Sequence, residues 1–165
     1  MINKMITDAD VKHFKSIPLN ELTSNISCHW AVGQFAHHLK SNQINPENGE
    51  YIFVLANPED IKNSTPLNTL DFNRLWDQQY GCNYRIADIL RHWSASIPLD
   101  PPLIACDFRK GTLEILDGRH RILVAHVLGT KLIPVAIHAS FADRLPDQFP
   151  QLIFSASNQF DVPIT

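Results

Sequence analysis

The residues best suited to chemistry form one short segment, Asp117-Gly-Arg-His-Arg121, between an apolar run typical of a strand and an apolar run typical of a helix. The first backbone amides of a helix have no intrahelical partner and point outward with the positive end of the helix dipole. Gly118 lets a bound group approach the backbone closely, and Arg119, His120 and Arg121 lie in the same first turn. The segment therefore predicts an anion-binding turn.

Two arginines in the first turn of a helix conflict with the helix dipole, since each exposed cation there costs about 0.3 to 1 kcal/mol. Violations of local stability rules often mark functional sites. A phosphate would turn the conflict into a gain, because it accepts hydrogen bonds from backbone amides and from guanidinium groups together. The alternative is that Arg119 and Arg121 pair with nearby carboxylates, namely Asp117, Glu114 or Asp100.

Phosphoryl transfer or phosphodiester cleavage needs cations on the phosphate, commonly Mg²⁺ held by carboxylates, and a base for the attacking oxygen. His120, with an ordinary pKa near 6.5, is the candidate base or phosphate donor. Glu59 and Asp60 follow an apolar strand-like run and are the candidate catalytic acids. The alternatives are a structural hydrogen bond for His120, and a solvated loop or helix N-terminal charge for the two acids. Asp100, before two prolines, is expected to cap or order its turn, and the alternative for this residue is a ligand contact.

No metal site is expected from the histidines or cysteines. Adjacent histidines on a helix point about 100° apart, and no carboxylate spacing completes a site around His29, His37 and His38, so we interpret these as surface residues. The three cysteines, Cys28, Cys82 and Cys106, are odd in number and widely separated, which indicates buried thiols of a reducing compartment.

We expect the predicted anion-binding turn, Asp117–Arg121, to lie between a hairpin and a helix, and we use the name phosphate turn for it. Leu103–Phe108 and Thr112–Leu116 predict two strands joined by a glycine-containing turn. The helix then runs to Leu128 with Gly129 as a left-handed C-cap, and Leu132–Ile137 predicts a buried strand.

Further elements are expected on both sides of this core. A helix starts near Asn83, because Ile86, Ile89, Leu90 and Trp93 recur at the spacing of one buried stripe. The other expected elements are a capped helix from Thr7, helical structure over Ser27–Leu39, a strand over Tyr51–Leu55, a helix over Asn68–Tyr80 closed by Gly81, and one short helix within residues 143–154. The fold class is α/β (α+β), with residues 1–50 as an N-terminal helical extension, residues 51–140 as the main domain and residues 141–165 as a tail packed on it.

Composition limits the partners. Fourteen Lys+Arg against 17 Asp+Glu give a formal charge of -3, which disfavours non-specific nucleic-acid binding. A negative net charge is still compatible with a local cluster of arginines in one pocket. No apolar run reaches the roughly 18 residues of a membrane helix, and the first residues lack the features of a secretory signal. We therefore expect a cytoplasmic protein without a membrane span.

The central segments resemble the superfamily of ParB N-terminal domains and sulfiredoxins. The resemblance rests on Pro101-Pro-Leu-Ile104, the short hairpin, Leu116-Asp-Gly-Arg-His-Arg121, the helix ending in Leu-Gly129, and Ile133-Pro-Val135. With Tyr51–Ile61 as the first strand and Ile86–Ser96 as the helix before the Pro-Pro segment, it extends loosely to residue 51. It implies a small mixed sheet with flanking helices.

The resemblance also implies a ligand. In this superfamily the turn binds nucleotide phosphate in sulfiredoxins, CTP in ParB proteins and ADP in a free-serine kinase, which maps phosphate binding onto Asp117, Gly118, Arg119, His120 and Arg121. The implied cofactor is ATP, ADP or CTP, with Mg²⁺ in catalytic members, and the kinase-like members place an active-site acid near Glu59 or Asp60.

This sequence departs from the superfamily pattern in two ways, and each departure makes one of the superfamily's known activities unexpected here. Sulfiredoxins carry their catalytic cysteine where this chain has Arg119, so sulfinic acid reductase activity is not expected. Partition proteins need a helix-turn-helix domain and a dimerisation region, for which the residues after Ile137 are too few. The leading hypothesis is a nucleotide-phosphate-binding domain, acting as an NTP-dependent phosphotransferase or NTPase. The alternatives are a metal-dependent nuclease and a non-catalytic ligand-sensing or protein-interaction module; the oligomeric state is not predicted.

Overall fold

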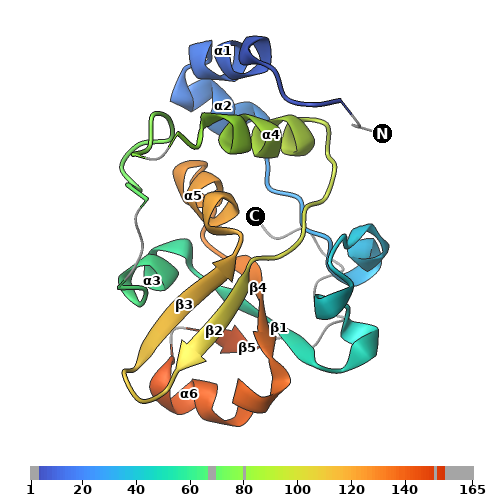
Figure 1. Cartoon of the computed structure of the whole chain (residues 1–165), viewed down its shortest axis with the longest axis vertical. Coiled ribbons are helices and arrows are strands. Elements are labelled where there is room, and N and C mark those ends of the chain that lie inside the picture. Colours follow the sequence, from blue (N-terminus) through green and yellow to red (C-terminus); the bar gives the residue numbers. More distant parts are fainter. Residues whose placement is uncertain (1–3, 67–69, 80, 151, 155–165) are drawn as a thin grey trace.

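A five-stranded mixed sheet forms the centre of the computed structural model, which describes residues 4–66, 70–79, 81–150 and 152–154. The strand order is β3-β2-β4-β1-β5; β2 and β4 run parallel, and the other neighbours are antiparallel (Figure 1). The strands are β1 (Tyr51–Ala56), β2 (Leu103–Asp107), β3 (Thr112–Asp117), β4 (Ile133–His138) and β5 (Ile153–Phe154). Mixed helices around a small mixed sheet agree with the α+β class expected from the sequence.

The middle of the sheet is its most apolar part. Residues 133–137 of β4 are buried, and Val54 of β1 faces Val135 of β4 in the antiparallel register. A strand buried on both faces reads as a continuous apolar run, which is how this segment was recognised in the sequence. The predicted hairpin of β2 and β3 is also confirmed, with Gly111 at φ +66° in the turn.

Two helices position the turn at residues 117–121, for which phosphate binding was predicted. The helix α5 (Arg119–Val127) follows β3 through Gly118 and ends with Gly129 at φ +82°, and α4 (Asn83–Ser94) packs against it. Figure 1 shows α5 leaving the end of β3 and lying against α4. The predicted stripe on α4 is confirmed, since its four members are buried, as are residues 122–125 of α5. Both helices are therefore fixed by their apolar faces.

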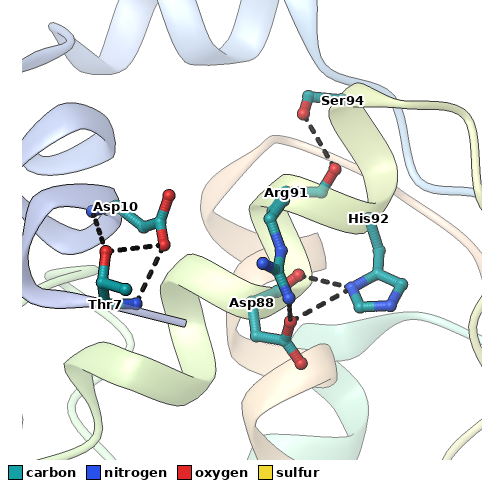
Figure 2. A network of polar contacts seen from close by, with 6 residues as sticks. All are labelled: Thr7, Asp10, Asp88, Arg91, His92 and Ser94. Atoms are coloured by element: carbon teal, nitrogen blue, oxygen red, sulfur yellow. Dashed lines mark hydrogen bonds and ion pairs between the residues drawn. The ribbon is translucent and has the colours of Figure 1, made fainter. Parts of the chain in front are cut away.

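The N-terminal extension begins as predicted. Thr7 caps α1 (Asp8–Ser16) in a capping box with Asp10, and α1 packs against α4 (Figure 2). The extension continues through α2 (Leu19–Asn25) and the 3₁₀ turns η1 (Gly33–His38), η2 (Asn42–Ile44) and η3 (Pro46–Asn48).

Of the helical structure expected over Ser27–Leu39, these described residues contain only the 3₁₀ helix η1. Trp30 instead forms a parallel bridge with Leu99, and Gly33 takes φ +57° before the 3₁₀ turn. The Ala31 amide donates to the Leu99 carbonyl at 2.9 Å, and the Leu99 amide donates to the His29 carbonyl at 2.9 Å. A pairing between residues far apart in the chain thus overrides the local helical spacing.

The helix expected over Asn68–Tyr80 is also wrong within its described residues, 70–79, which form turns and bends; residues 68, 69 and 80 lie outside the description. Here the Gln78 side chain replaces helical bonds. Its oxygen accepts from the Asp71 amide at 2.8 Å, and its nitrogen donates to the carbonyls of Asp71 and Arg74 at 2.9 and 2.7 Å. Side-chain bonds of this kind compete with helix formation.

Two further segments contain elements beyond those expected, and the short helix expected within residues 143–154 is present. The residues after β1 form a helix, α3 (Pro58–Asn63), capped by Asn57. The tail, expected to hold one short helix, contains η4 (Ala139–Arg144), α6 (Leu145–Gln148) and the short strand β5.

The cysteines agree in part with the expectation of buried thiols. All three cysteines are free; Cys82 is buried, whereas Cys28 and Cys106 are partly buried. Burial raises the pKa of the Cys28 and Cys106 thiols to about 11 in each case. Among the described residues, no helix is both long and apolar enough to cross a membrane.

Candidate functional site

The turn that starts α5 requires glycine for two reasons. Gly118 has φ +90°, a region that L side chains rarely adopt. A Cβ at this position would lie 2.7 Å from Nη2 of Arg121 and 2.9 Å from Cα of Pro102. Pro102 is itself held to the sheet, since its carbonyl accepts from the Ala136 amide at 2.8 Å. The Pro-Pro segment and the turn therefore pack in direct contact.

A pocket of about 490 Å³ opens beside this turn. Residues 115–121, at the end of β3 and the start of α5, line it together with Arg85, Asp88 and Ile89 of α4 and with Leu99. The structure thus gathers all five predicted phosphate-binding residues, Asp117 to Arg121, in one pocket. It adds Arg85 and Asp88, which the sequence analysis missed.

Three guanidinium groups line the pocket, on Arg85, Arg119 and Arg121. Nη2 of Arg121 lies 3.0 Å from Oδ2 of Asp117, so this arginine makes one of the local carboxylate pairs expected as the alternative to phosphate binding. Arg85 is exposed and makes no ion pair with the part of the chain that the structure describes. Asp100 instead accepts from the Lys40 and Ser41 amides, at 2.9 Å in each case, so its carboxylate joins this segment to residues 40 and 41.

His120 is a buried histidine with an uncommitted nitrogen. The residue is 5% exposed, and its Nε2 makes no hydrogen bond with the described residues. Burial, and then the positive charges of Arg119, Arg85 and Arg121, lower the pKa of His120 to about 4. The imidazole is therefore neutral at neutral pH, and Nε2 is available either to donate a hydrogen bond or to accept one.

The two predicted catalytic acids lie elsewhere. Glu59 is in the first turn of α3, and its carboxylate is 3.6 Å from Nδ1 of His126, in the last turn of α5. His126 is six residues after His120, which corresponds to about 9 Å along a helix axis. Glu59 also approaches Lys62 at 3.7 Å, and neither Glu59 nor Asp60 lines the pocket. The structure therefore does not bring these acids to the phosphate turn.

Asp88 is the acid that α4 contributes to the pocket. Its Oδ1 lies 2.9 Å from Nη2 of Arg91 and 3.3 Å from Nδ1 of His92, and Nδ1 of His92 donates to the Asp88 carbonyl at 2.8 Å (Figure 2). These contacts hold the carboxylate against its own helix. Arg85 and Asp88 are three residues apart, so they share a helix face beside the buried stripe, and this spacing was the available sequence signal.

No family model, curated protein or solved structure matches this chain. The chemistry of the pocket is therefore inferred from its own residues.

The His, Cys, Asp and Glu side chains are the chain's possible metal ligands. Within residues 4–66, 70–79, 81–150 and 152–154, no group of three or more His, Cys, Asp or Glu side chains is arranged to hold a metal ion. His37 and His38 are exposed, as expected, and their rings stack with centroids 4.2 Å apart. His29 is partly buried rather than a surface residue, and burial lowers its pKa.

Proposed function

We propose that the pocket between α4 and the start of α5 binds the phosphate groups of a nucleotide. The observation that carries the proposal is the convergence of unlike anion-binding groups on one pocket. The first turn of α5 supplies backbone amides next to Gly118, and Arg85 and Arg121 supply guanidinium groups from two helices. The lining also includes His120, whose buried Nε2 makes no hydrogen bond with the described residues. Guanidinium and backbone amide donors together are the usual partners of phosphate.

A nucleotide fits better than a bare anion. The pocket volume of about 490 Å³ falls within the range of small-molecule sites, roughly 300 to 1,000 Å³. Leu99, Ile115 and Leu116 line the same pocket, and Leu116 is 53% exposed. These apolar groups offer a surface for a base or ribose beside the charged turn. The resemblance to the ParB and sulfiredoxin superfamily, although no family model matches, points to the same ligand class: ATP, ADP or CTP.

Catalysis is an extension of this proposal rather than its core. A phosphotransferase or NTPase reaction would use the neutral imidazole of His120 as its base, because His120 belongs to the pocket lining and a base must be unprotonated. The acids within reach are Asp88 and Asp117, not Glu59 or Asp60. The formal charge of -3 gives a nuclease no comparable support.

Thermal unfolding with ATP, ADP, CTP, GTP or inorganic phosphate, each with and without Mg²⁺, tests the proposal. A ligand at about 100 times its dissociation constant adds roughly 2.7 kcal/mol, or on the order of 5 to 10 °C for a chain of this size. We expect such a shift with at least one nucleotide, and its loss in Arg85→Ala, whose side chain makes no ion pair with the residues that the structure describes.

Arg109→Ala is the matched control, because Arg109 is an exposed arginine in the β2–β3 turn, at the far end of β3 from the pocket. It should keep the full shift. The proposal fails if no nucleotide shifts the wild type, or if Arg85→Ala and Arg109→Ala respond alike.

A further inference from the structure

The phosphate turn already holds one anion, which belongs to the chain itself. Oδ2 of Asp117 lies 3.0 Å from Nη2 of Arg121, directly before the N-terminus of α5, where a bound anion is favoured. The two partners differ in how firmly they are held. The Arg121 side chain is 15% exposed and lies over Gly118, whereas the Asp117 side chain is 73% exposed.

The carboxylate is therefore the member of the pair that can leave. Exposed ion pairs of this i,i+4 kind are worth a factor of about five or less in an equilibrium constant. After the carboxylate turns away, water can solvate it, since most of its surface already faces solvent. Arg121 stays in place, because Gly118 and the neighbouring Pro102 define the space in which it lies. A ligand oxygen can then take the position of Oδ2.

We infer that Asp117 is a displaceable internal anion, which a ligand phosphate replaces on Arg121, and that the site consequently favours doubly charged phosphates over singly charged ones. This inference rests on the proposed function of the pocket. It assigns Asp117 the role of limiting affinity, not of binding the ligand.

The charge preference follows from the groups that line the pocket. Asp117 pairs with Arg121 and Asp88 pairs with Arg91, whereas Arg85 makes no ion pair with the described residues, so its positive charge remains in the pocket. A singly charged anion on Arg121 only replaces a carboxylate of equal charge. A doubly charged phosphate, such as the terminal group of a nucleotide, brings a further charge into the remaining positive field. A phosphodiester, as in a nucleic-acid backbone, is singly charged and lacks this gain.

The test is the affinity of Asp117→Asn for matched ligands. AMP and CMP are doubly charged at pH 7.5, because the second pKa of a phosphate monoester is about 6, and their 3′,5′-cyclic esters are singly charged. Titration calorimetry in low salt with a chelator should show about tenfold tighter binding of the monoester to Asp117→Asn than to the wild type. The gain for the cyclic ester should be smaller, about threefold, because the added field acts on half the charge.

Glu114→Gln is the matched control. It removes an exposed acid from the same strand, with the same change of net charge, and Glu114 does not line the pocket. We expect its affinities to stay within about twofold of the wild type, since exposed charges outside the pocket are screened by solvent and salt. Tm values within a few degrees for all three proteins establish that each is folded.

The possible results separate this inference from the proposed function. If the wild type and Asp117→Asn both bind none of the nucleotides, the proposed function fails and this inference fails with it. If nucleotides bind but Asp117→Asn binds them equally or more weakly, only the internal-anion role is overturned. A loss of binding in Mg²⁺, together with no gain in chelator, would make Asp117 a metal ligand instead, which also overturns it.

Discussion

A neutral histidine among three arginines is the most unusual feature at the residue scale. Burial and the charges of Arg119, Arg85 and Arg121 all favour the unprotonated imidazole of His120. The sequence showed that this residue starts a helix beside two arginines, but not that it is 5% exposed or that Arg85 approaches it from α4. Burial and the third charge depend on how α4 and α5 pack, which no local pattern encodes.

This environment predicts a dependence of stability on pH. The pKa of His120 is about 4 in the folded chain and about 6.5 when unfolded, so between these values the unfolded chain binds a proton that the folded chain does not. Stability should be fully present above about pH 6.5 and fall as the pH drops towards 4. Between pH 7 and pH 5 the loss from this group is on the order of 2 kcal/mol.

Urea unfolding of the wild type and His120→Gln between pH 7.5 and 5 measures this loss. Carboxylates titrate in both proteins, so the difference between the two curves isolates the imidazole. The wild-type stability should fall more steeply on acidification. Parallel curves would show that His120 is not held neutral by its surroundings.

At the scale of elements, the connection from β3 to α5 fixes the pocket. A strand run, an Asp-Gly pair, an apolar helical run and Gly129 were local signals, and the hairpin, turn and helix that they predicted are all present. Local signals failed where a distant group replaced the local hydrogen bonds. Trp30 pairs with Leu99, and the Gln78 amide bonds the backbone of Asp71 and Arg74.

The two glycines at the ends of α5 provide a direct comparison. Gly118→Ala must accept φ +90° and a contact of 2.9 Å with the backbone of Pro102, whereas Gly129→Ala must accept φ +82° in open space. We expect Gly129→Ala to lose about 1 kcal/mol of stability and Gly118→Ala to lose about 1 to 3 kcal/mol more. Chemical denaturation measures both, and nucleotide affinity should fall in Gly118→Ala only. Equal losses of stability would mean that the turn at Gly118 accommodates a side chain without a clash against Pro102.

At the scale of the whole molecule, the N-terminal extension helps to place the pocket. The helix α1 packs against α4, which carries Arg85 and Asp88, and Asp100 accepts from the backbone amides of Lys40 and Ser41. These contacts join residues 1–50 to the helix and to the Pro-Pro segment on either side of the pocket. The extension resembled nothing recognisable in the sequence, so its contribution to the site could not be foreseen.

The packing of α3 explains why Glu59 and Asp60, the acids predicted to be catalytic, lie away from the pocket. Glu59 follows β1, as the resemblance required, but α3 rests against the last turn of α5, where Glu59 approaches His126. Which end of α5 receives α3 is decided by the three-dimensional arrangement and not by the order of elements. The turn at residues 117–121, by contrast, is one continuous segment, so its residues lie close together in any fold.

The most direct test of the central claim is to map nucleotide contacts over the whole chain by ¹H–¹⁵N NMR during an ADP titration. If the pocket binds phosphate, the amide signals of Gly118, Arg119 and His120 shift together with the side-chain signal of Arg85, and those of the β2–β3 turn at residues 109–111 stay in place. Shifts centred on another part of the chain, or no shifts at ADP concentrations up to several millimolar, would contradict the assignment of this pocket as a nucleotide-phosphate site.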